Sequence, residues 1–400
     1  MTDALSLFPP TRAAAQERLS AFVPRAGITY ARTRNEDRGP SRRDNVSALS
    51  PYVKLRMIDE IAMTRAVLSQ QDQETGEKFL AEVFWRTYWK GWLELRPGVW
   101  RQYQHDLSRL QDDLQTQSGL RQRWETACTG ETGIDAFDAW AWELAQTGYL
   151  HNHARMWFAS IWIFTLDLPW QLGADFFLRH LLDGDAAVNT LSWRWVAGIQ
   201  TRGKTYLATA ENIAANTAGR FPEVTGLARQ AVARPAPEDP PPADLPPCPQ
   251  PTPSGRYGLL LHGDDIDCDR LMRRYPDPVT LAYAEATAGH TPWEMAPHVA
   301  TFRQKAAQDG APSGTTLDIL PSAASILTWA QDNRLDQIIA PYAPVGPMRD
   351  LLDQIGDDTA APLLSMDRRP LDSAAWPLAT KGFFKFRKNI PDLIDRFVTG

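Results

Sequence analysis

The sequence has only three cysteines among its 400 residues, and Cys128, Cys248 and Cys268 lie far apart. Cysteines so few and so scattered exclude a disulfide framework and a cysteine-based zinc site. No apolar run approaches the roughly 18 residues of a membrane span, and no signal-peptide pattern opens the chain. The protein is therefore expected to be cytoplasmic, without a membrane partner.

An excess of positive charge is also missing, because the formal net charge is −6. This argues against a generally basic coat for nucleic acid, although a local basic groove remains open. One local run of arginines is either a solvated loop or part of a DNA-facing rim: Arg32, Arg34, Arg38, Arg42 and Arg43.

Tryptophan, by contrast, is abundant, and twelve of the fifteen lie between Trp85 and Trp195. Most of them are expected to fill a large helical core, since an indole buries much apolar surface. A redox or light-driven function would need only three or four of them.

Proline marks a boundary, because ten of these residues lie between Arg234 and Ser254. Such a run neither packs as a helix nor pairs as a strand. It predicts a semi-rigid linker over residues 223–254, between one domain of residues 1–222 and another of residues 255–400. Two domains also agree with a length that exceeds a usual single core.

The first domain is expected to be almost wholly helical. Ser50 is a capping hydroxyl before a proline at the first helical position. A helix beginning at Thr75 carries Glu82, Trp85 and two further tryptophans in one stripe. Further helices, and no strand, are predicted in this part over residues 135–147, 150–165, 171–182 and 205–217.

The second domain changes to short apolar runs that alternate with helical stretches, which is typical of a parallel α/β sheet. No glycine pattern in it matches a phosphate-binding fingerprint. Strands are predicted over 257–262, 317–320 and 336–340, with helices over 322–333 and 346–355. The expected fold class is therefore an all-helical domain followed by a Rossmann-like parallel α/β domain.

The segment Asp183–Trp195 holds two carboxylates, a carboxamide and two indoles in thirteen residues. Buried acids need partners or cost several kcal/mol. On a helix, Asn189 and Trp193 share a face, whereas Trp193 and Trp195 point about 200° apart. This layout suits a flat, nitrogen-rich cofactor on one side; the alternative is a polar helix end packed on two core indoles.

Five motifs occur in order along the first domain: Ala13–Leu19 followed by Phe22 and Tyr30, Val46–Tyr52, Glu82–Arg86, Thr147–Met156 and Asp183–Trp195. Together they resemble the FAD-binding helical domain of the DNA photolyases and cryptochromes. Tyr342–Asp350 and Thr380–Phe386 resemble parts of that family's α/β antenna domain, which precedes the helical domain in the usual member. The two domains are therefore expected in exchanged order, with an unrelated α/β domain as the alternative.

The resemblance implies FAD as cofactor, and leaves open whether the second domain holds an antenna chromophore. Arg155 and Asp183 would form an ion pair against the flavin ring, Asp185 would contact the cofactor, and Asn189 would face flavin N5. Ser47 and Ser50 would hold the diphosphate, with Tyr30 nearby, and Ala48 and Leu49 are also expected to bind the cofactor. Without the resemblance, Ser50 reads as a plain helix cap.

The resemblance also implies a pocket for a flipped cyclobutane pyrimidine dimer, formed by Glu82, Trp85, Asn152, Met156 and Trp195. Trp193 and Trp170 match the inner members of an electron-transfer chain; with Asn189 and Glu82 they are the expected catalytic residues. The outermost member is left open between Trp100, Tyr103 and another aromatic. Trp85 could instead belong to the core stripe.

The predicted function is light-driven repair of pyrimidine dimers in DNA by a monomeric FAD enzyme. Two alternatives remain: a light-sensing flavoprotein without repair activity, and repair restricted to single-stranded DNA. His153 stands where the family has an arginine, which removes a phosphate contact and favours these alternatives. No metal is expected, because the imidazoles of His151 and His153 diverge on a helix.

Overall fold

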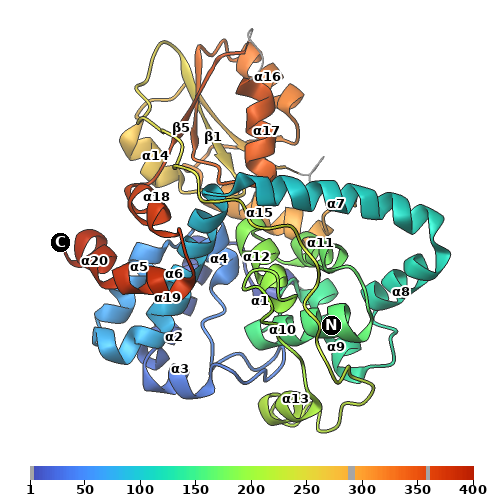
Figure 1. Ribbon diagram of the computed structural model, residues 1–400. Coiled ribbons are helices and arrows are strands. Elements are labelled where there is room, and N and C mark those ends of the chain that lie inside the picture. The colour runs from blue at the N-terminus through green and yellow to red at the C-terminus, as the bar shows by residue number, and fades with distance from the viewer. Residues whose placement is uncertain (1–3, 287–292, 357–360) are drawn as a thin grey trace.

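A computed structural model describes residues 4–286, 293–356 and 361–400 (Figure 1). No strand occurs in residues 4–222, as predicted. The helices of this part are α1 (Ala4–Leu7), α2 (Arg12–Phe22), α3 (Ile28–Thr33), α4 (Ser50–Lys54), α5 (Glu60–Leu68), α6 (Gln73–Glu94), α7 (Pro97–Thr116), α8 (Ser118–Thr129), α9 (Asp135–Thr147), α10 (Asn152–Ser160), α11 (Trp170–His180), α12 (Ala186–Val196) and α13 (Ala210–Asn216). None of the helices in the described ranges has the length and apolar character needed to span a bilayer.

The helix boundaries follow local capping chemistry in most places. Asp72 caps α6 by accepting from the backbone of Thr75, and Asp185 caps α12 in the same way. The prediction for Ser50 was wrong by one residue. Leu49 already has helical dihedral angles and occupies the cap, so Ser50 is the first residue of α4. The predicted helix over 150–165 ends in a π-turn over Ile161–Thr165.

The second part forms one parallel sheet of five strands: β1 (Tyr257–His262), β2 (Thr280–Ala284), β3 (Asp318–Leu320), β4 (Gln337–Pro341) and β5 (Leu363–Asp367). Their order is β3-β2-β1-β4-β5. The strands β2 and β3 are added on one side of β1, and the chain then crosses to the other side of β1 to form β4 and β5. The three predicted strands are confirmed, whereas β2 and β5 were missed. The fold class is confirmed: a helical domain followed by a Rossmann-like parallel α/β domain.

The two faces of the sheet belong to different cores, because strand side chains alternate. Leu259 and Leu261 of β1 join the large core that continues into the helical domain. Leu260 joins a smaller core on the opposite face of the sheet. The helices around the sheet are α14 (Cys268–Arg274), α15 (Pro297–Asp309), α16 (Ala323–Asp332) and α17 (Pro347–Gly356).

The proline-rich segment has neither helix nor strand between residues 217 and 256. It is nevertheless bonded to the helical domain: Ala243 donates to the carbonyl of Leu95, and Arg194 pairs with Asp239. It therefore runs as a strap along the helices. The division at residues 222 and 255 stays a prediction.

After β5 the chain returns to the helical domain, where red ribbon lies beside α5 and α6 (Figure 1). The elements there are α18 (Pro370–Ala375), α19 (Phe383–Phe386) and α20 (Ile390–Ile394). Gly91 on α6 makes this approach possible, because a Cβ there would lie 2.7 Å from the Cα of Trp376. The C-terminal elements thus become part of the helical domain's surface.

Candidate functional site

A cavity of about 670 Å³ opens into the helical domain, within the usual size of a ligand site. Its wall comes from α3, the turn into α4, α6, α10, α12 and α19. The predicted site residues that line it are Tyr30, Ser47, Ala48, Leu49, Ser50, Glu82, Trp85, Asn152, Arg155, Met156, Asp183, Asp185, Asn189, Trp193 and Trp195. Among the predicted site residues, Trp170 alone does not line it.

A bidentate ion pair forms one polar edge of the cavity. Arg155 donates from Nη1 and Nη2 to the two carboxylate oxygens of Asp183, at 3.0 and 2.9 Å. Burial alone would raise the pKa of Asp183, but Arg155 and the hydroxyl of Ser50 hold it below its usual value. The pair is therefore ionised, with its charges fixed in direction.

Asp185 joins the cavity to helix α12. One carboxylate oxygen accepts from the backbone of Val188 at 3.1 Å, and the other lies 2.9 Å from Lys90 Nζ. Burial opposes ionisation, yet Lys90 and Arg86 lower the pKa of Asp185 to about 2. The cap fixes the first turn of α12, which presents Asn189 to the cavity. The amide of Asn189 donates to the carbonyl of Ala174 at 2.7 Å, so its side-chain oxygen is left for a ligand.

The turn from Val46 to Ser50 supplies hydroxyl and backbone groups at another part of the wall. Ala48 has a positive φ of 47°, which is unusual for a residue with a side chain. The hydroxyl of Ser47 accepts from the backbone of Leu49 at 3.4 Å. Tyr30 lies nearby, and burial raises the pKa of its phenol, which stays protonated.

The predicted substrate residues line the same cavity but already have neighbours. Glu82 accepts from Arg34 at 2.5 Å, and burial raises the pKa of Glu82. The ring of Trp85 stacks on Phe383, with centroids 3.6 Å apart and planes 11° apart. Trp195 stacks on Tyr206 at 5.8 Å. One face of Trp85 is therefore covered by α19.

Phe384 is a cavity residue that the sequence analysis missed. It lies on α19, lines the cavity and is 78% exposed. Its neighbours Phe383 and Phe386 are buried on the opposite face. The sequence pattern assigned the segment Thr380–Phe386 to the α/β domain. The adjacent residues Phe383 and Phe384 were the only sign in the sequence that this segment has apolar side chains on two faces.

Trp193 and Trp170 belong to two aromatic groups. Trp193 is 2% exposed and packs edge-on against Phe177 at 5.1 Å. Its indole N–H is buried without a hydrogen-bond partner among the described residues. Trp170 lies 5.7 Å from Tyr103, which lies 5.2 Å from Trp100.

Neither Trp100 nor Tyr103 reaches solvent, since their exposures are 1% and 2%. The indole of Trp100 donates to Asp350 of α17 at 2.9 Å. This row of aromatics therefore ends at the contact between the helical domain and the sheet domain.

The basic run is largely neutralised. Arg34 pairs with Glu82, Arg38 with Glu36 and Asp44, and Arg43 with Glu143. The remaining two arginines, at positions 32 and 42, are exposed. The choice between a solvated loop and a DNA-facing rim stays open.

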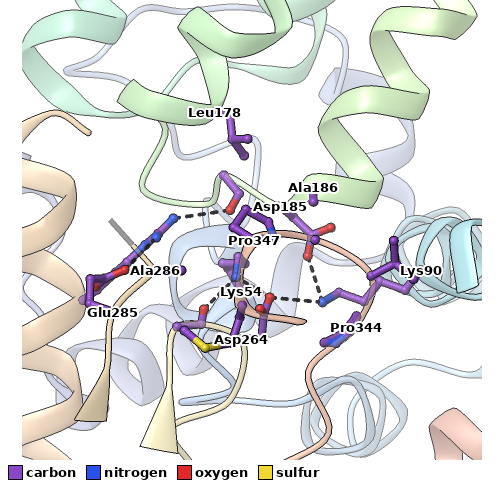
Figure 2. Close-up of a pocket in the computed structure, with 16 residues that line it drawn as sticks. Lys54, Lys90, Leu178, Asp185, Ala186, Asp264, Glu285, Ala286, Pro344 and Pro347 are labelled. Carbon is purple, nitrogen blue, oxygen red and sulfur yellow. Dashed lines mark hydrogen bonds and ion pairs between the residues drawn. The ribbon is translucent and has the colours of Figure 1, made fainter. Parts of the chain in front are cut away.

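A second, much smaller crevice lies where the helical domain meets the sheet, and it has only about 40 Å³ of space. It is bordered by Gly184 and Asp185, so it lies directly behind the large cavity. Figure 2 shows charged side chains converging there: Lys54, Lys90, Asp185 and Asp264. Sequence analysis missed both lysines, because a lysine in a helix is usually a surface residue.

Comparison with known proteins agrees with this geometry. The sequence profile described as "FAD binding domain of DNA photolyase" matches residues 79–220, which include most of the cavity's wall. Residues 79–220 are therefore similar to the FAD-binding domain of the DNA photolyases. Two curated members of this family are named deoxyribodipyrimidine photo-lyase. One, from a strain of Thermus thermophilus, is 33% identical over 202 residues, which cover 49% of this chain and 44% of that protein. The other, from Vibrio cholerae, is 27% identical over 190 residues, which cover 44% and 39%.

Two solved structures of the family also align. A Synechocystis cryptochrome covers 52% of this chain and 43% of its own, with 22% identity and a TM-score of 0.43. A class III photolyase from Agrobacterium tumefaciens covers 49% and 40%, with 27% identity and a TM-score of 0.40. The chain matches less than half the length of each of these four relatives.

Proposed function

We propose that the protein binds FAD in the large cavity and uses light to split cyclobutane pyrimidine dimers in DNA. One observation carries the proposal: a single cavity joins the ion pair Arg155–Asp183 and Asn189 to the indoles of Trp85 and Trp195. A cofactor and an extruded base can therefore meet in one space. Extruding a damaged base costs less than extruding an intact one, which provides selectivity.

Residues of the cavity fit a flavin in their chemistry. The turn of Ser47, Ala48, Leu49 and Ser50, with Tyr30 beside it, offers the donors that a diphosphate needs. The fixed charges of Arg155 and Asp183 and the free oxygen of Asn189 suit a ring with several nitrogen and oxygen atoms. The N–H of Trp193, which has no partner in the part of the chain that the structure describes, is a further donor in the wall. When bound in its reduced form, FAD supplies an electron upon absorbing light.

On the substrate side, the wall of the cavity offers both apolar and polar groups. Trp195 and Met156 give flat apolar surface for the bases, and Trp85 borders them from α6. Glu82 and Asn152 supply hydrogen-bonding groups for base edges. Burial raises the pKa of Glu82, which brings its protonated, donating form closer to neutral pH.

A surface for the DNA strand lies beside this opening on and around α19. Lys381, Phe384, Lys385 and Lys388 lie on α19 or within two residues of its ends and are all exposed. Within the described chain, none of the three lysines has an acidic partner at ion-pair distance. An exposed phenylalanine between unpaired lysines suits a base flanked by phosphates.

Trp193 and Trp170 are assigned to electron supply rather than to repair. Indole can donate an electron while remaining packed. Tyr103 and Trp100 extend the row from Trp170. In this proposal, an electron that reaches the cavity through Trp193 restores the reduced cofactor, and dimer cleavage itself does not require it.

A light-sensing flavoprotein without repair activity is the second candidate. The stacking of Phe383 on Trp85 and the ion pair of Arg34 with Glu82 favour it, because both occupy groups needed for a dimer. His153, in place of an arginine, favours it as well. Repair limited to single-stranded DNA is consistent with the same loss of a phosphate contact.

The decisive experiment illuminates purified, chemically reduced protein with dimer-containing oligonucleotides, single- and double-stranded. Restored absorbance of the pyrimidines near 260 nm, in light and not in darkness, is the expected result. Undamaged oligonucleotides and the variant Trp195→Ala serve as controls. Absence of repair on both strand forms, with FAD bound, would reject repair in favour of the photoreceptor.

A further inference from the structure

The small crevice lies where an open α/β sheet normally holds its ligand. In such sheets the ligand binds outside the carboxyl ends of the strands, at the point where the strand order reverses. Here that point is between β1 and β4, and the crevice is lined by Gly263 and Asp264 after β1 and by Pro344–Gly346 after β4. A space of about 40 Å³ holds about three water molecules. A ring-bearing ligand does not fit.

Charged side chains occupy the space instead. Lys54 Nζ lies 2.6 Å from Asp264 Oδ1 and 2.6 Å from the carbonyl of Gly263. Lys90 Nζ lies 3.7 Å from the same oxygen of Asp264 and 2.9 Å from Asp185. Asp264 thus connects the sheet domain to Asp185 through a lysine of α6 (Figure 2).

A second contact reaches the same loop from α15. Arg303 donates to Glu285, which follows β2, at 3.2 Å and to the carbonyl of Gly184 at 3.4 Å. Gly184 lies between Asp183 and Asp185 and has no side chain to interfere. A Cβ there would lie 2.8 Å from the carbonyl of Leu178.

We propose that the sheet domain positions the flavin site, with Asp264 and Arg303 as the positioning residues. Asp264 holds Lys90 against Asp185, and Arg303 holds the backbone of Gly184. The loop is thereby fixed from behind, while its front presents Asp183 and Asp185 to the large cavity. This inference rests on the proposed binding of FAD.

The charge state of the cluster supports this role. Burial alone would raise the pKa of Asp264, but Lys54 and Lys90 hold it well below its usual range. The carboxylate therefore stays ionised at neutral pH. Without it, two buried ammonium groups would repel each other, and Lys90 would lose one of its two acidic partners.

The test compares two variants that each remove one carboxylate from an ion pair between the domains. Asp264→Asn removes the charge behind the flavin loop. Glu60→Gln removes the partner of Arg369, 2.8 Å away, and Glu60 borders neither the cavity nor the crevice. Both variants are expected to lower the melting temperature of the apoprotein.

Only Asp264→Asn is expected to weaken FAD binding, by at least about tenfold, and to alter the visible circular dichroism of the bound flavin. Equal loss of FAD affinity in both variants, or wild-type affinity and spectrum in Asp264→Asn, overturns the proposal. Wild-type protein that binds no FAD overturns the proposed function itself.

If Asp264→Asn does not fold, the double variant Asp264→Asn/Lys54→Met is used instead. It removes the lysine that lost its partner, and its affinity for FAD can then be measured. Arg303→Gln provides an independent measurement, because it removes the contact to Gly184 and leaves Asp264 intact. It should also weaken FAD binding, and wild-type affinity in this variant rejects the role of Arg303.

Discussion

The large cavity and the small crevice lie on two sides of the same loop, Asp183–Asp185, and both occupy places where proteins bind ligands. In the cavity, most of the wall is apolar, and its charged side chains pair along the wall, as in Arg155–Asp183 and Arg34–Glu82, and leave the space open. In the crevice, lysines and carboxylates satisfy one another and leave about 40 Å³. The comparison shows that a favourable place in the fold is not enough for ligand binding. The volume and charge of the side chains at that place decide whether a ligand can bind there.

The largest expected effect comes from the ion pair in the cavity. Asp183→Ala leaves Arg155 as a partly buried charge without its carboxylate partner, which costs about 3 kcal/mol. The dissociation constant for FAD should rise by at least about 100-fold. Titration of the apoprotein with FAD, followed by flavin fluorescence, measures it. The control is Asp239→Ala, which breaks the pair with Arg194 away from the cavity, and equal losses in both would contradict the assignment.

In the crevice, a pH-dependent effect is expected from Lys54. Burial lowers the pKa of Lys54 to about 8 from 10.5, so the unfolded chain binds more protons between these values. Stability due to this group therefore rises with pH from about 8 to 10.5, by up to about 3 kcal/mol. Urea unfolding should show this rise in wild type relative to Lys54→Met. Parallel pH profiles for the two proteins would contradict the shifted pKa.

Two tryptophans of the cavity should separate electron supply from substrate binding. Trp193→Phe is expected to block photoreduction of oxidised FAD and to spare repair by chemically reduced protein. Trp85→Ala should leave photoreduction intact and weaken dimer binding by about 1–3 kcal/mol. Flash photolysis and binding to labelled oligonucleotides measure the two effects. If both variants lose the same activity, one of the two assignments is wrong.

The smallest effect is expected at the rim of the cavity. Phe384→Ala should weaken binding of dimer-containing DNA by about 1 kcal/mol, because one exposed stacking surface is lost. The matched control is Leu363→Ala on β5, which is 60% exposed and lies outside the cavity. Gel-shift titration distinguishes them. Similar affinity in both variants would remove α19 from the proposed DNA surface.

Much of the candidate site could be predicted because its parts are local in sequence. Asp185, Asn189 and Trp193 follow helical spacing, so one helix brings them to one face. The short strands β1 and β4 could also be predicted, since each is a buried apolar run. The strands β2 (Thr280–Ala284) and β5 were missed because alanine in one and Ser365 in the other weaken the strand pattern.

The remaining features depend on contacts between distant segments. Nothing near Trp85 indicates that Phe383 covers its ring, and nothing near Asp185 indicates that Lys90 links it to Asp264. Ser50 missed the cap position because Leu49 already turns with helical angles. Such details follow from packing, and packing is fixed by residues that a local pattern does not contain.

The contact between α19 and α6 has a consequence for how the protein is made. Ribosomes add about 5–20 residues per second, so Phe383 emerges about 10–40 s after Trp195. During that interval the nascent helical domain has an uncovered Trp85 and lacks the support of Asp264 for part of the time. Stable loading of a cofactor is therefore expected to follow synthesis, and until then the uncovered indole of Trp85 adds exposed apolar surface to the unfinished chain.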